Sequence, residues 1–177
     1  MKADWKIDRL EVDKGVCAAV FSTGPYNAPR GALAPEILVL VRRPDGQETL
    51  AQFLGRFTNK GTFAPMQASA CPASACVAMK GLQPGRYGKD GDSLPRIVAF
   101  AADQPSFPGL VFEAPQGPPR SSAQGVAYYR PDQTLQRIPG TLYYLVSLDT
   151  ASSIESSAAA DFDWFLQHIQ VEGAGRQ

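Results

Sequence analysis

The stretch EILVLVRR, Glu36 to Arg43, decides the fold class because it is the clearest strand signal in the chain. It is a short, unbroken run of branched aliphatic side chains, which is typical of a strand covered on both faces. The sequence Pro44-Asp45-Gly46 follows at once and is a strong turn signal. The next segment, QETLAQFLGRF, fits either a partner strand or a short helix. Gly55 and the preceding turn favour the strand of a hairpin.

Similar strand patterns lie on both sides of this stretch: WKIDRLEV and GVCAAVFS before it, and CVAMKG, RIVAFAA, residues 110–112, VAYYRP and TLYYLVSLD after it. One helix is expected near the C-terminus, where Ser152 and Glu155 match a capping box. Apolar residues then follow at helical spacing, namely Ala158, Phe162, Phe165, Leu166 and Ile169. We therefore expect one α+β domain over residues 1–177, with a mainly antiparallel, sandwich-like sheet of about eight strands and one C-terminal helix.

Composition and charge exclude some classes of protein. With 177 residues and 44% hydrophobic side chains, the chain can bury a substantial core. Lys plus Arg and Asp plus Glu both number 17, and this balance argues against a nucleic-acid partner. No apolar run reaches the length of a membrane span, and the N-terminus has no apolar signal core. The chain is therefore either cytoplasmic or an exported protein whose signal or lipid anchor has been removed.

The three cysteines bear on the compartment. Cys17 lies in an apolar run and is expected to be a buried thiol, whereas Cys71 and Cys76 flank the small residues Pro-Ala-Ser-Ala. A disulfide between Cys71 and Cys76 fits best, because small residues allow the chain to turn back on itself. A redox dithiol would usually be spaced Cys-x-x-Cys, and a zinc site would need all three cysteines and His168. Two free thiols are the remaining alternative. A disulfide implies an oxidising compartment, so we expect a periplasmic protein.

Few residues suggest catalysis. His168 is the only histidine, and its place near the end of the expected helix suits a surface residue. A hydrolase that uses Ser, Asp and His168 is the alternative from another class, but no Gly-x-Ser-x-Gly elbow, Walker loop or His-Glu-x-x-His motif accompanies it. The segment GKDGDS, residues 88–93, is an acidic turn that lacks the full ligand set of a calcium loop. We expect no catalytic residue, no metal and no cofactor.

Two Tyr-Tyr pairs suggest a surface for a protein partner. Tyr128-Tyr129 and Tyr143-Tyr144 lie in strand patterns that we expect to be neighbours in the sheet. Alternation along a strand then places one tyrosine of each pair outward, where the two serve either cross-strand packing or partner binding. The Pro-rich loop TGPYNAPRG is a second candidate contact. The candidate partner-binding residues are Tyr128, Tyr129, Arg130, Arg137, Tyr143, Tyr26 and Arg30.

The C-terminal stretch GTLYYLVSLDTASSIESSAAADFDWFLQHIQVE, about a fifth of the chain, resembles periplasmic immunity proteins of bacterial type VI secretion lipase effectors. The resemblance implies a non-enzymatic inhibitor that caps the active site of an effector, and it assigns no site residues. The leading hypothesis is therefore an envelope protein that binds and blocks a secreted antibacterial effector. Besides the hydrolase, the alternative is a structural, lipoprotein-like subunit of the envelope.

Overall fold

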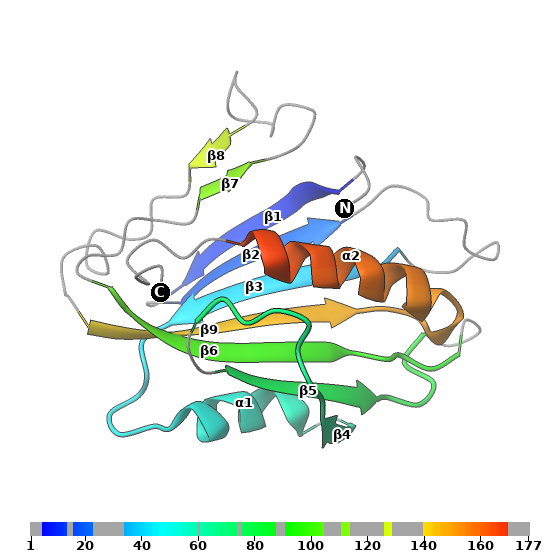
Figure 1. Cartoon of the computed structure of the whole chain (residues 1–177), viewed down its shortest axis with the longest axis horizontal. Helices are drawn as coiled ribbons and strands as arrows, with labels where there is room; N and C mark the ends of the chain where they lie inside the picture. The colour runs from blue at the N-terminus through cyan, green and yellow to red at the C-terminus, as the bar shows by residue number, and fades with distance from the viewer. Residues whose placement is uncertain are drawn as a thin grey trace.

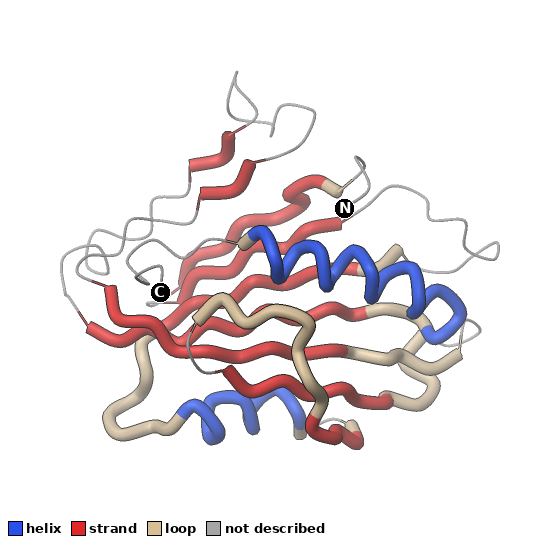
Figure 2. The backbone as a smooth tube through the Cα atoms, in the orientation of Figure 1, coloured by secondary structure: helices blue, strands red, loops and turns tan. Residues whose placement is uncertain are grey.

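The central layer of the protein is an antiparallel sheet of seven strands, with a helix on each face (Figure 1). The computed structural model describes residues 5–13, 16–22, 34–59, 61–73, 76–87, 91–104, 111–113, 126–128 and 140–169. Figure 2 shows the helices, strands and loops among these residues. The sheet strands are β1 (Lys6–Asp13), β2 (Val16–Ser22), β3 (Glu36–Arg42), β4 (Thr62–Pro65), β5 (Cys76–Leu82), β6 (Arg96–Gln104) and β9 (Gly140–Asp149).

The order of strands across the sheet is β1-β2-β3-β9-β6-β5-β4, so β9 lies between β3 and β6. Two further strands, β7 (Val111–Glu113) and β8 (Val126–Tyr128), form a separate antiparallel ribbon. The helices are α1 (Leu50–Thr58) and α2 (Glu155–His168), and the short 3-10 turn η2 (Ser152–Ile154) precedes α2. The described residues thus confirm an α+β fold with a mainly antiparallel sheet and a C-terminal helix.

The two helices cover opposite faces of the sheet. Val98 and Phe100 of β6 belong to the core beneath α2, whereas Ile97 and Ala99 belong to the core beneath α1. Because successive strand residues point to opposite faces, these two cores lie on the two sides of the sheet. The larger core contains, among others, Trp5, Phe21, Ile37, Val39, Val41, Leu142, Tyr144, Val146, Leu148, Phe162, Phe165 and Leu166.

Strand β3 is covered on both faces, as its sequence predicts. Ile37, Val39 and Val41 are at most 1% exposed and belong to the core beneath α2. The alternate residues Leu38 and Leu40 are half-buried and pack against the smaller core. The unbroken aliphatic run is therefore explained by the two layers of side chains that enclose this strand.

The segment after β3 is a helix, and the expected hairpin strand is wrong. The turn at Gly46, with φ at 58°, leads into a capping box in which Thr49 Oγ1 accepts from the Gln52 amide and Gln52 Oε1 accepts from the Thr49 amide. Apolar residues at helical spacing then face the sheet, namely Leu50, Phe53, Leu54 and Phe57. Capping and 3.6-residue periodicity together outweigh the turn signal and Gly55.

The predicted helix at the C-terminus is confirmed, but its predicted capping box is wrong. Ser152 lies in the 3-10 turn, and α2 begins at Glu155 with no side-chain hydrogen bond at its N-cap, Ile154. The Glu155 carboxylate instead pairs with Arg96 of β6 and with Lys80 of β5, the latter at 3.0 Å. A local capping pattern is thus replaced by ion pairs to distant strands.

At the β4 edge of the sheet, Gly81 makes room for an aromatic ring. Gly81 lies opposite Phe63 in the β4–β5 pair. A Cβ atom at Gly81 would lie 2.6 Å from the Phe63 ring, well inside van der Waals contact. The ring itself packs against the core beneath α1. Any larger residue at position 81 would therefore push the Phe63 ring out of its place.

Candidate functional site

The tyrosine cluster expected from the sequence does not form as predicted. Strand β8 pairs with β7, whereas β9 pairs with β3 and β6, so Tyr128 does not lie on a strand next to Tyr143 and Tyr144. Tyr144 is 3% exposed and stacks on Phe100, with ring centroids 4.9 Å apart. Tyr143 points to the opposite face, where it is half-buried against Phe53 and donates a 2.6 Å hydrogen bond to the Glu48 carbonyl. Both tyrosines of β9 therefore pack within the fold.

The other candidate partner-binding residues are not tested by this structure. Tyr128 ends strand β8, and only its backbone is described. Five more lie outside the described residues, namely Tyr26, Arg30, Tyr129, Arg130 and Arg137. The side chain of Cys17, expected to be a buried thiol, is likewise outside the description, although its backbone lies in β2.

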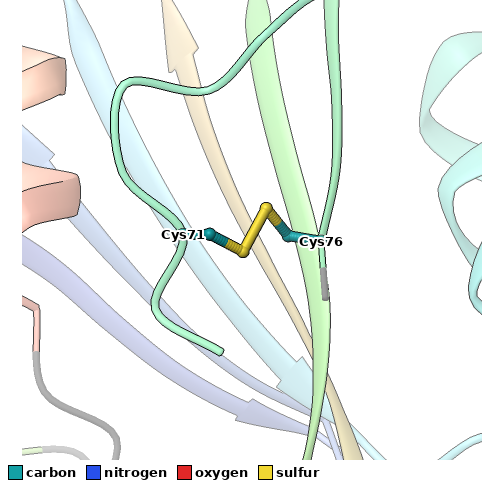
Figure 3. Close-up of a disulfide and its surroundings, with 2 residues drawn as sticks. All are labelled: Cys71 and Cys76. Carbon is teal, nitrogen blue, oxygen red and sulfur yellow. A yellow bond between two sulfur atoms is a disulfide. The ribbon is translucent and has the colours of Figure 1, made fainter. Parts of the chain in front are cut away.

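Cys71 and Cys76 form a disulfide, as predicted (Figure 3). Cys76 is half-buried and begins β5, whereas Cys71 is exposed. Because the two sulfurs are bonded to each other, neither is available to the zinc site or to the pair of free thiols considered above. Among the described residues, no cluster of His, Cys, Asp and Glu is arranged to hold a metal ion.

Residues Met66–Ala73, the cysteine loop, lie on the same face of the sheet as α2. The loop runs from β4 toward β5 and crosses in front of β6 in Figure 1. The Met66 amide donates to the Ala78 carbonyl at 2.9 Å, and the Ser69 hydroxyl bonds Asp163 of α2 at 2.9 Å. Small side chains complete the contact with the larger core, namely Ala68, Ala70 and Ala73. The loop is therefore a direct neighbour of the helix.

Among the described residues, the outer side of α2 has no exposed Asp, Glu, Lys or Arg. Phe162, Phe165 and Leu166 point into the core, so the opposite side of the helix meets solvent. We call this side the α2 surface; its exposed residues are Ser156, Ser157, Ala160, Trp164, Gln167 and His168. A solvent-facing helix surface usually carries acidic and basic side chains, and the exposed residues of this one include no Asp, Glu, Lys or Arg. Trp164, at 38% exposed, is its largest side chain.

Trp164 and His168 form a stacked pair at the C-terminal end of this surface. Their ring centroids are 3.8 Å apart and the rings are 15° from parallel. His168 Nδ1 lies 2.7 Å from the Trp164 carbonyl oxygen, so Nδ1 carries a proton and donates. Among the described residues, no serine or aspartate hydrogen-bonds His168. The stack holds the indole in one orientation on the helix.

Side-chain contacts at three positions along α2 fix it to the sheet and to the segments beside it. At its start, Glu155 pairs with Arg96 and Lys80. Burial by itself would raise the pKa of Glu155, but the hydrogen bonds and charges of the two cations hold it below its ordinary value. In the middle, Trp5 Nε1 donates to the buried Asp161 carboxylate at 2.8 Å, and toward the end Ser69 bonds Asp163. The α2 surface is therefore presented on a braced helix.

A polar cluster at the end of β9 joins Ser93, Arg86 and Asp149. Ser93 is fully buried and donates to Asp149 Oδ1 at 2.6 Å, and Arg86 pairs with Asp149 Oδ2 at 2.7 Å. Burial, followed by the Asp149 charge, raises the pKa of Tyr87 well above its ordinary value. No histidine joins this serine and aspartate in the described part of the chain. The cluster fastens the turn before β6 to the end of β9.

A second charged cluster holds the corner between β3 and α1. Arg42 pairs with Glu48 at 2.5 Å and lies over the Phe53 ring, 5.0 Å from its centroid. Arg56 pairs with both Glu48 and Asp45, at 2.8 and 3.1 Å. The two arginines and two carboxylates neutralise one another and hold this corner in place.

Comparison of the chain with protein-family models, with curated proteins and with solved structures found no match. None of the described helices is long and apolar enough to cross a membrane. The sequence interpretation missed the α2 surface, although the signal for it was present. Placing Phe162, Phe165 and Leu166 on the inner side of the helix leaves Trp164 on the outer side.

Proposed function

We propose that this protein is a non-enzymatic binding protein of the bacterial envelope, which docks onto another protein through the α2 surface. The observation that carries the proposal is Trp164, an exposed indole on a helix surface whose exposed residues include no Asp, Glu, Lys or Arg. Tryptophan is enriched at binding hot spots because its large, rigid ring gives much contact area at little cost in conformational entropy. Uncharged neighbours also reduce the cost of removing water when a partner docks.

The braced position of α2 supports this proposal. Contacts from Arg96, Trp5 and Ser69 hold the helix at its start, middle and end. Stacking on His168 further restricts the Trp164 ring. A surface that is already ordered before binding loses less conformational entropy when the complex forms, so more of the contact energy appears as affinity.

Within this class, the specific form we propose is an immunity or inhibitor protein that binds and blocks a secreted antibacterial effector. The stretch that resembles immunity proteins of type VI secretion lipase effectors includes β9 and α2, so the resemblance falls on the segment that carries the α2 surface. The disulfide between Cys71 and Cys76 supports a location in an oxidising compartment, for which we propose the periplasm.

The test is a quantitative capture experiment with three tagged proteins: the wild type, Trp164→Ala, and Val77→Ala as a matched control. Val77 is 39% exposed, close to the 38% of Trp164, but it lies on β5. Its strand partner Ala99 belongs to the core beneath α1, so Val77 faces the side of the sheet away from α2. Each protein is incubated with an envelope extract of the source organism, and the captured proteins are quantified by mass spectrometry.

The proposal expects one stoichiometric partner with the wild type and with Val77→Ala, and at least a tenfold weaker affinity with Trp164→Ala, as for a hot-spot residue. Titration of the purified partner then measures direct binding, and an equimolar amount of this protein should inhibit the partner's enzymatic activity. Equal capture by Trp164→Ala and Val77→Ala would exclude the α2 surface. A partner that binds but keeps full activity would exclude inhibition.

A further inference from the structure

The cysteine loop has few restraints apart from its disulfide. Its inward side chains are alanines and one methionine, and each alanine buries a single methyl group. One backbone hydrogen bond, from Met66 to Ala78, holds its beginning, and one side-chain hydrogen bond, from Ser69 to Asp163, joins it to α2. The covalent bond between Cys71 and Cys76 is thus the strongest single restraint on the position of this loop.

The loop touches α2 next to the residue that carries the proposed binding. Asp163, which bonds Ser69, directly precedes Trp164 in the helix. Release of the loop removes the hydrogen bond to Asp163 and uncovers the core side chains that the loop shields. The position of the loop and the order of the C-terminal half of α2 are therefore physically connected.

We propose that the Cys71–Cys76 bond is a site of thiol–disulfide exchange with a protein dithiol, and that its redox state controls how firmly α2 presents Trp164. This inference rests on the proposed function, because it concerns the regulation of the same surface. Cys71 is exposed, whereas Cys76 is half-buried at the start of β5, so Cys71 is the accessible half of the bond. A buried structural disulfide would offer neither sulfur to a reductant.

The exchange proceeds in two balanced steps. A thiolate of the partner dithiol attacks Cys71 Sγ, forms a mixed disulfide with it and displaces Cys76 as a thiolate, which takes up a proton. The second thiolate of the dithiol then attacks the sulfur of the dithiol's other cysteine, which is bonded to Cys71 in the mixed disulfide. This displaces Cys71 as a thiolate, which is also protonated. The protein gains two thiols, and the dithiol becomes a disulfide. Reoxidation by a disulfide-bearing partner is the reverse sequence.

The test uses hydrogen exchange on the isolated protein, so it does not depend on any binding partner. Amide exchange is measured for the oxidised wild type, for the wild type treated with dithiothreitol in native buffer, and for the double variant Cys71→Ser/Cys76→Ser. Thiol trapping and mass spectrometry report whether the bond has been reduced. Ser69→Ala, which keeps the disulfide but loses the bond to Asp163, tests the connection between loop and helix.

Reduction in native buffer should accelerate exchange of the Met66 amide, which donates to the Ala78 carbonyl, and of residues 163–168 by about fivefold, the factor that one ordinary hydrogen bond supports. Exchange in β3 should stay unchanged, the double variant should match the reduced protein, and Ser69→Ala, with its disulfide intact, should accelerate exchange in residues 163–168. A disulfide that resists dithiothreitol without denaturant would overturn the proposal. Unchanged exchange in α2 after reduction, or faster exchange throughout the sheet, would overturn it as well. Loss of partner binding in Trp164→Ala is a separate result, which tests only the proposed function.

Discussion

The buried contact between Trp5 and Asp161 allows a sharp test of how α2 is held. Trp5 is 1% exposed and Asp161 is 7% exposed, and the indole Nε1 donates to Asp161 Oδ2 at 2.8 Å across 156 positions of sequence. Trp5→Phe keeps an aromatic ring in the core but removes this donor. A hydrogen bond to a charged group contributes about 1.5 to 3 kcal/mol.

A double-mutant cycle separates the hydrogen bond from the loss of ring volume. Trp5→Phe, Asp161→Ala, the double variant and the wild type are unfolded with urea and followed by circular dichroism, all with the disulfide intact. The expected coupling energy between the two positions is about 1.5 to 3 kcal/mol. Asp163→Ala is the matched control on the same helix: since Asp163 bonds Ser69, its effect should add to that of Trp5→Phe. A coupling between Trp5 and Asp161 below about 0.5 kcal/mol would refute the reasoning.

Three further predictions follow from single contacts. Gly81→Ala should lower the free energy of unfolding by about 1 to 3 kcal/mol, because its Cβ meets the Phe63 ring; an unchanged urea midpoint would contradict this. Because the pKa of Glu155 is lowered in the folded state, its carboxylate is protonated more readily in the unfolded chain, so the free energy of unfolding should decrease as the pH drops below about 4.3. Glu155→Gln should make this decrease shallower, and an equal decrease in wild type and variant would refute the prediction. Tyr143→Phe should cost about 1 kcal/mol through its lost bond to the Glu48 carbonyl, measured by urea unfolding, and no change would show that the bond contributes nothing.

The parts of the fold that follow from local patterns could be predicted from the sequence. The aliphatic run of β3 and the apolar spacing of α2 each describe the environment of one element, so both were identified. Cys71 and Cys76 are close in sequence, and small residues separate them, so their disulfide was also predictable. These features depend on neighbours within a few positions along the chain.

The errors concern contacts between distant segments and signals that compete locally. Glu155 fitted a local capping pattern, but Arg96 and Lys80, brought near by the sheet, offered stronger partners. The segment of α1 was ambiguous, and its Thr49–Gln52 capping box went unrecognised beside the turn signal. The expected tyrosine surface is wrong for a related reason. The sequence places Tyr143 at the surface, but α1 covers that face of β9.

Strand β9 lies between β3 and β6, so the two halves of the sheet can join only after β9 has formed. Leu40 of β3 lies opposite Leu145 of β9, and Leu145 also lies opposite Ala99 of β6. Until residues 140–149 insert, the hairpins of β1–β3 and β4–β6 are two half-sheets, each with an open edge. Closing such distant pairings is slow, because the entropy of a long loop must be lost before the contacts form. Until strand β9 pairs with β3 and β6, each half-sheet therefore presents an unpaired edge that is prone to aggregation and that a chaperone would protect.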